Sequence, residues 1–195
     1  MTELAEPGLA TASPTQAPRR ATARFMRGHP AHWIALGFGS GLSPWAPGTV
    51  GTLWAWAAFL VLDPWLCGQW GNSGDAAWAG VLVMALALGQ WACTRTAQHL
   101  ASADPGAIVW DEVLAFWCVL WLIAPAGFWA QAVAFGLFRF FDAVKPGPVA
   151  WADQHFKLKP GQRIGWRQGW GILFDDLVAA LCTLLVITLW QRTMT

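Results

Sequence analysis

The side chains best suited to chemistry in this sequence are two adjacent acidic pairs, Asp111-Glu112 and Asp175-Asp176, each at the start of an apolar stretch. Asp104 precedes the first pair and is a weaker candidate. A carboxylate at the centre of a membrane span costs about 2.5–3.5 kcal/mol, whereas its favourable interaction with a helix dipole contributes only about 0.3–1 kcal/mol. Helix capping is the alternative explanation, but we expect at least one carboxylate of the first pair to need a cation partner.

A third motif places Arg139, Asp142 and Lys145 three residues apart, so that all three occupy one side of a helix and can face one ligand. The alternative is an ion pair between Asp142 and Lys145, with Arg139 extending toward lipid headgroups. Pro146 is expected to end this helix.

A glycine-rich segment, residues 37–51, offers the hydroxyls of Ser40, Ser43 and Thr49 beside glycine N–H groups. Such a loop can cradle a phosphate. No Gly-Lys-Ser/Thr follows the glycines, so the loop is not of the Walker A type. A re-entrant turn whose glycines only relieve crowding is the alternative.

Two acidic pairs together with Asp142 on one face of one bundle would repel each other unless they were protonated or neutralised by a metal. Magnesium, which prefers oxygen ligands and binds phosphate oxygens, is the cation that fits best. The four cysteines lie far apart and match no zinc or thiol-redox spacing.

The elements that must position these groups are apolar. The chain has 195 residues, of which 56% are hydrophobic and 12% charged, a composition that indicates lipid as the solvent. Because a spanning helix needs about 20 residues, we expect an all-α polytopic bundle of about five spans, the fourth continuing toward Lys145. A shorter run, His32 to Leu42, is expected to be re-entrant or interfacial. The five stretches are Val50 to Cys67, Ala76 to Cys93, Ala107 to Ala124, Gly127 to Phe141 and Ile172 to Trp190.

The distribution of basic residues predicts the orientation. With five spans, every Lys and Arg except Arg192 falls on the side of the N-terminus, which the positive-inside rule assigns to the cytoplasm. All the polar motifs fall on the same side. We expect a disordered basic tail over residues 1–29 and a membrane-embedded domain over residues 30–195. A net charge of +1 argues against a nucleic-acid partner.

Taken together, these motifs resemble the signature of the phosphatidylglycerophosphatase A family over roughly residues 30–190. The resemblance implies magnesium-dependent dephosphorylation of phosphatidylglycerol phosphate to phosphatidylglycerol in a bacterial inner membrane. The chain departs from the pattern in having Ala115 and Ala180 in place of glycine, and Gly147-Pro148 in place of an aromatic residue followed by Pro. The matching segments are Gly-Phe-Gly-Ser-Gly-Leu-Ser-Pro at 37–44 with Pro47-Gly-Thr49, Ile108-Val-Trp-Asp-Glu112, Phe138-Arg-Phe-Phe-Asp142 with Lys145-Pro146, and Gly171-Ile-Leu-Phe-Asp-Asp176.

This resemblance leads to expected roles. The magnesium ligands and the base that orients water are expected among Asp111, Glu112, Asp142, Asp175 and Asp176. The substrate phosphate is expected to contact Ser40, Ser43, Gly48, Thr49, Arg139 and Lys145. Whether water or an aspartate is the nucleophile stays open. The rival functions are a cation-binding transporter or channel subunit and a non-catalytic scaffold, and clustering of the carboxylates on one face argues against the transporter.

Overall fold

The computed structural model describes residues 19–156 and 163–194, and every regular element in these ranges is a helix. In chain order the elements are α1 (Ala23–Met26), α2 (Pro30–Ala35), η1 (Gly37–Leu42), α3 (Pro47–Trp70), η2 (Gly71–Ser73), α4 (Gly74–Leu100), α5 (Trp110–Ile123), α6 (Phe128–Val144), α7 (Pro148–Phe156) and α8 (Trp166–Met194). The expected all-α class is confirmed.

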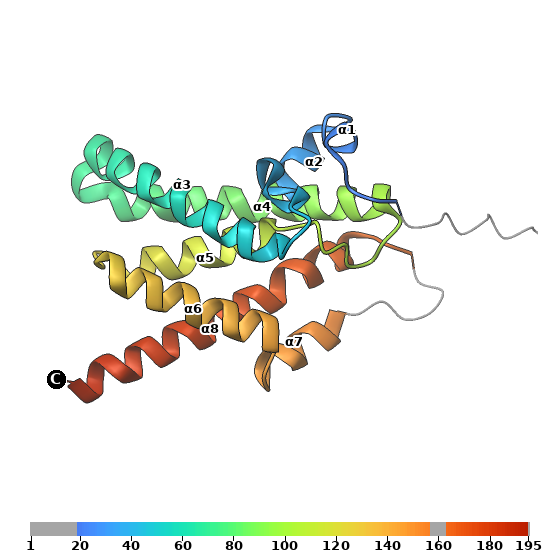
Figure 1. Cartoon of the computed structure of the whole chain (residues 1–195). Coiled ribbons are helices and arrows are strands. Elements are labelled where there is room, and N and C mark those ends of the chain that lie inside the picture. Colours follow the sequence, from blue (N-terminus) through green and yellow to red (C-terminus); the bar gives the residue numbers. More distant parts are fainter. Residues whose placement is uncertain (1–18, 157–162, 195) are drawn as a thin grey trace, which may run out of the picture.

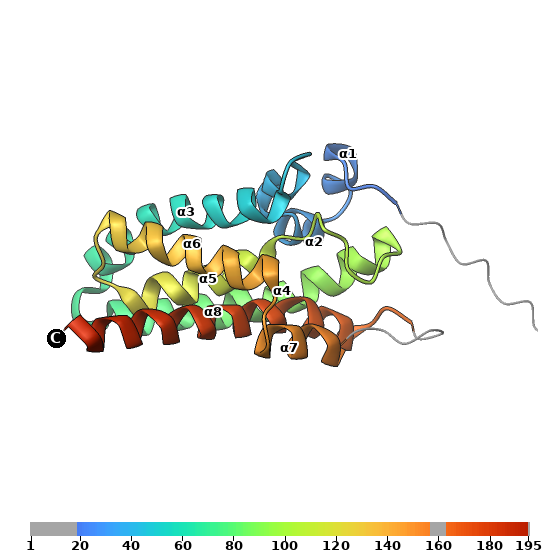
Figure 2. The same cartoon turned by 60° about the horizontal axis from the view of Figure 1, so that its bottom comes forward.

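The long helices α3, α4, α5, α6 and α8 run along a common direction (Figures 1 and 2). The short helices α1, α2 and α7, together with the start of α8, gather at one end of this bundle, which we call the site end. The opposite end carries the turns from α3 to α4 and from α5 to α6, and the C-terminus (Figure 1). Arg192 lies in the last turn of α8, away from the site end.

Three helices, α3, α4 and α8, are long and apolar enough to cross a membrane. This is a membrane protein. Helices α5 and α6 have 14 and 17 residues and fall short of the length of about 20 that a full span needs, so the count of five spans stays a prediction. The expected continuation of the fourth stretch past Phe141 is confirmed, because α6 ends at Val144 and Lys145 caps it.

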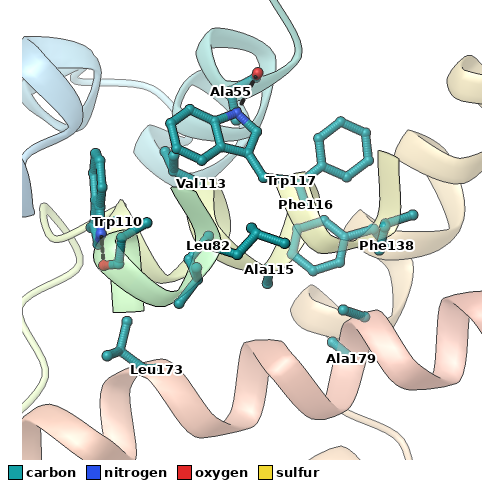
Figure 3. Packing of buried hydrophobic residues seen from close by; sticks show 14 of the residues in the cluster. Ala55, Leu82, Trp110, Val113, Ala115, Phe116, Trp117, Phe138, Leu173 and Ala179 are labelled. Atoms are coloured by element: carbon teal, nitrogen blue, oxygen red, sulfur yellow. Dashed lines mark hydrogen bonds between the residues drawn. The ribbon is translucent and has the colours of Figure 1, made fainter. Parts of the chain in front are cut away.

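Helix α5 lies at the centre of the packing and is buried over most of its length (Figure 3). Its two buried indoles satisfy their N–H groups with backbone carbonyls: Trp117 Nε1 donates to Ala55 O and Trp110 Nε1 donates to Ala85 O, both at 2.9 Å. These bonds tie α5 to α3 and α4. The first turn of α5, which carries Asp111 and Glu112, is thereby fixed in the bundle.

Small residues line the contact between α5 and α8. Ala115 and Ala179 are fully buried in the same apolar cluster, and Ala180 is 2% exposed (Figure 3). Small side chains let helices approach closely where lipid gives no hydrophobic drive for association. The two alanines that replace the expected glycines therefore remain small enough for α8 to bring Asp175 and Asp176 to α5.

The structure describes the segment before the glycine-rich loop from Arg19 onward, and residues 1–18 of the expected tail lie outside the described ranges. Its anchor is His32 on α2. The Nδ1–H of His32 donates to Phe25 O, which leaves Nε2 of the neutral ring to accept from His99 Nδ1–H on α4, each at 2.8 Å. Burial, with His99 and His29 nearby, lowers the pKa of His32 below its usual value of 6.5.

This arrangement predicts a pH dependence for the docking of α2. Because the folded pKa of His32 is lowered, the undocked segment binds more protons below about pH 6.5, and the stability of docking is lost as the pH falls through that region. Hydrogen exchange of the α2 amides, corrected for its intrinsic pH dependence, should show less protection at pH 5.5 than at pH 8. The His32→Gln variant should lose most of this difference. Equal protection of the unaltered protein at both values would contradict the assignment.

Candidate active site

Three carboxylates from two helices meet at the site end. One oxygen each from Asp111, Glu112 and Asp176 lies within 4.8 Å of the others. Asp111 Oδ1, Glu112 Oε2 and Asp176 Oδ2 are buried without a hydrogen-bond partner. Buried acceptors without donors are costly, and charged carboxylates this close repel. A divalent cation that prefers oxygen ligands would satisfy all three groups, so these residues fit the expected magnesium.

These carboxylates line a cavity of about 410 Å³ between α5, α6, α7 and α8. Its wall is strongly acidic, and Lys145 is the one basic residue among the described residues that line it. Such an excess of negative charge favours binding of cations in the cavity. The acidic residues are Asp104, Asp111, Glu112, Asp142, Asp153, Asp175 and Asp176.

Arg139 is held beside the cluster by three side chains. Its Nη1 lies 2.5 Å from Asp142 Oδ2 and 3.6 Å from Glu112 Oε1, and it donates to Thr52 Oγ1 at 3.4 Å. The hydroxyl of Thr52 in turn donates to Gly48 O at 2.8 Å. The helical spacing therefore pairs Asp142 with Arg139, three residues earlier, and the alternative pairing of Asp142 with Lys145 is not the one found.

Lys145 ends α6 in a left-handed conformation, with φ of 47°, and its N–H donates to Phe141 O. Its ammonium group donates to Asp175 Oδ2 and lies 3.7 Å from Asp153 Oδ1. Arg139, Asp142 and Lys145, which were predicted to share one side of a helix, are thus all at the site. Each forms an ion pair: Arg139 with Asp142 and Glu112, and Lys145 with Asp175 and Asp153.

Most of the glycine-rich segment lies outside the acidic cavity. A Cβ on Gly41 would lie 2.1 Å from Ala107 O, so the loop packs directly on the segment that leads into Asp111. The hydroxyl of Ser40 donates to Gly37 O and that of Ser43 to Trp45 O, both at 2.8 Å, so both bond within their own loop. Neither serine lines the cavity, and neither does Thr49.

Gly48 is the member of that segment that reaches the site. A Cβ on Gly48 would lie 2.2 Å from Glu112 Oε1 and 3.1 Å from Arg139 Nη2. A larger residue at this position would require the ends of the Glu112 and Arg139 side chains to move. Gly48, which was predicted to contact the phosphate, therefore lies next to the carboxylate cluster. Its nearest neighbours in the structure are the side chains of Glu112 and Arg139.

Three further residues belong to the site and carry no clear motif. Thr52 contacts Arg139, Asp153 approaches Lys145, and Gln168 lines the cavity. Gln168 Nε2 donates to Ala103 O at 2.6 Å, whereas its Oε1 is buried without a partner. A spacing of seven residues puts Gln168 on the same face of α8 as Asp175, which is the one sequence signal that could have identified it.

The close approach at Gly41 predicts that Gly41→Ala is destabilising. The new methyl group would overlap Ala107 O, a backbone atom that cannot turn aside as a flexible side chain can, and such overpacking costs about 1–3 kcal/mol in a packed interior. The melting temperature in detergent, followed by tryptophan fluorescence, should therefore fall. Gly136→Ala on α6 is the matched control, because a Cβ there meets no atom within 4 Å, and it should not lower the melting temperature. Equal melting temperatures for the two variants would show that Gly41 has more space than the structure gives it.

Comparison with known proteins agrees with this geometry. The family model for phosphatidylglycerophosphatase A matches residues 33–191. "Phosphatidylglycerophosphatase A" of Escherichia coli (strain K12) is 34% identical over 167 residues, covering 83% of each chain. The Haemophilus influenzae protein of the same name is 34% identical over 159 residues, which cover 82% of this chain and 87% of the relative.

A third relative carries a different name. The "Putative phosphatidylinositol-3-phosphatase" of Bacteroides thetaiotaomicron is 32% identical over 160 residues, which cover 79% of this chain and 89% of the relative. No solved structure matches the chain significantly. The matched region runs from within α2 into the last turn of α8 and contains every residue that lines the acidic cavity. The chain therefore belongs to the phosphatidylglycerophosphatase A family of phosphatases.

Proposed function

We propose that this protein hydrolyses the terminal phosphomonoester of phosphatidylglycerol phosphate, giving phosphatidylglycerol and phosphate, and that the reaction requires Mg²⁺. The observation that carries the proposal is the set of unpartnered, buried oxygens on Asp111, Glu112 and Asp176, within 4.8 Å of one another and beside two fixed cationic side chains. Carboxylates for a metal and cations for a phosphate are the groups that phosphoryl transfer needs in one place.

Asp111, Glu112 and Asp176 would hold the metal. The chemistry that bound Mg²⁺ supplies there is neutralisation of the charge on the phosphoryl oxygens. The other two predicted ligands, Asp142 and Asp175, each have a cation partner already, in Arg139 and Lys145. We therefore assign them first to orienting these two cations toward the phosphate.

Arg139 and Lys145 would bind the phosphomonoester in different ways. The planar guanidinium of Arg139 matches two phosphate oxygens at once, whereas the ammonium group of Lys145 acts as a point charge. The N–H groups of Gly48 and Thr49 lie in the first turn of α3, where backbone donors have no acceptor within the helix, and Gly48 adjoins Arg139. They are suited to a third phosphate oxygen. Ser40 and Ser43 take no part in this proposal.

The proposed location is a bacterial inner membrane, with the site end facing the cytoplasm. This proposal is supported by the uneven distribution of Lys and Arg between the two ends of the bundle. In the described ranges, Arg192 lies in the last turn of α8. The other basic residues lie before α3, near the C-terminal end of α4, or between the second half of α6 and the start of α8. These regions belong to the site end (Figure 1). An excess of Lys and Arg marks the cytoplasmic side of membrane proteins.

The direct test is phosphate release from phosphatidylglycerol phosphate by the detergent-purified protein. We expect turnover with Mg²⁺, none after chelation, and recovery when Mg²⁺ is returned. Asp176→Asn should lower kcat by about 100-fold or more, as losses of groups that stabilise transition-state charge do. Asp63→Asn, at the opposite end of the bundle, is the control and should remain active, because an amide oxygen can still accept from Trp78 Nε1.

Two results would count against the proposal separately. No phosphate release from protein whose fold is verified would overturn the lipid phosphatase activity. Release that continues after complete removal of divalent cations would overturn the role of Mg²⁺ and leave the phosphatase activity in place.

A further inference from the structure

Helix α7 contributes a carboxylate to the cavity that the proposed chemistry does not use. We propose that Asp153 is a positioning residue, which keeps the ammonium group of Lys145 directed into the cavity when the substrate phosphate competes with Asp175 for it. The inference rests on the proposed phosphatase function, because it assigns Lys145 to the phosphate.

The backbone places Asp153 for this purpose. The left-handed conformation of Lys145 and the positive φ of Gly147 end α6 and redirect the chain, so that α7 lies along the first part of α8 (Figure 2). Val149 and Ala152 are fully buried and fix the position of α7. Asp153 follows Ala152 directly and lines the cavity.

The end of α7 is also anchored. A Cβ on Gly171 of α8 would lie 2.6 Å from the Cβ of Phe156, so the two backbones approach closely at this point. The ring of Phe156 is 5.2 Å from that of Phe174, one further turn along α8. Asp153 is therefore carried on a helix that packs against its neighbour at both ends.

Lys145 stands between two carboxylates on different elements. Its ammonium group donates to Asp175 and lies 3.7 Å from Asp153 Oδ1. An ammonium group has three N–H donors and can hold more than one acceptor at a time. The contact with Asp175 is much the closer of the two, so Asp153 is the secondary partner in the state described.

The difference between the partners gives Asp153 its role. Asp175 is next to Asp176 of the three-carboxylate cluster. A phosphate bound at that cluster would attract the ammonium group of Lys145 and so weaken its contact with Asp175. Asp153 lies on α7, outside that cluster, and can keep its ion pair while Lys145 turns to the phosphate. The side chains of Lys145 and Asp153 are 33% and 17% exposed, so solvent screens the pair and its contribution is modest.

The first test compares Asp153→Asn with Asp153→Glu and with Gln154→Ala, a neighbouring exposed position on α7. For Asp153→Asn we expect KM for phosphatidylglycerol phosphate to rise about three- to tenfold, while kcat stays within about twofold of the unaltered protein. This pattern is expected because the lost contact would bind the substrate and the transition state equally well. The equilibrium Kd for inorganic phosphate, measured by calorimetry, should rise by the same factor. Asp153→Glu should restore both values, and Gln154→Ala should match the unaltered protein.

The second test asks whether Asp153 acts through Lys145. In a Lys145→Met background, Asp153→Asn should cause no further change in the Kd for inorganic phosphate, because coupled residues are not additive. Additive effects would overturn the inference and indicate that Asp153 contacts the ligand itself.

Other outcomes are equally decisive. Unchanged KM and phosphate affinity in Asp153→Asn would overturn the inference. So would a loss of kcat that Asp153→Glu does not restore, since that result indicates a structural role for α7. Failure of the proposed function is distinguishable: the unaltered protein would release no phosphate from the lipid, while the calorimetric comparison would still report on the link between Asp153 and Lys145.

Discussion

The repulsion among three buried carboxylates is the constraint on which the rest of this structure depends. If all three were ionised and uncompensated, Asp176 on α8 would be repelled by Asp111 and Glu112 on α5. The fold brings them together nevertheless, from the first turn of α5 and from α8. One buried oxygen on each has no hydrogen-bond partner, and this is the reason we propose a divalent cation at this place.

The bundle opposes this repulsion by packing. The indole of Trp117 bonds to the backbone of α3, and small residues such as Ala115 and Ala179 allow α5 and α8 to approach closely. Arg139 and Lys145 of α6 add positive charge at the edge of the cluster, each shared between two carboxylates. Helix packing sets the positions of the acidic groups, and the two cations moderate their charge without neutralising it.

The sequence alone predicted the long helices α3, α4, α5, α6 and α8 and most of the acidic residues that line the cavity, because apolar stretches and adjacent acidic pairs are local patterns. It did not predict helix α7, whose first residues were expected to form a loop. It also placed Arg139, Asp142 and Lys145 on one side of α6, since helical spacing is fixed. It could not predict how these side chains pair, which depends on the distance between helices. Thr52 and Asp153 gave no signal for the same reason: each is a single polar residue whose importance comes from tertiary contact. The sequence also could not show that the hydroxyls of Ser40 and Ser43 donate within their own loop, because such bonds depend on the backbone conformation of the loop.

The most direct measurement of the central claim is the position of a bound metal. Crystals of the protein grown with Mn²⁺ in place of Mg²⁺ would locate the ion by anomalous scattering. We predict a peak about 2.0–2.6 Å from carboxylate oxygens of Asp111, Glu112 and Asp176, the range of oxygen–metal distances for hard divalent cations. A peak bound to other residues, or none at Mn²⁺ concentrations that support turnover, would contradict the account.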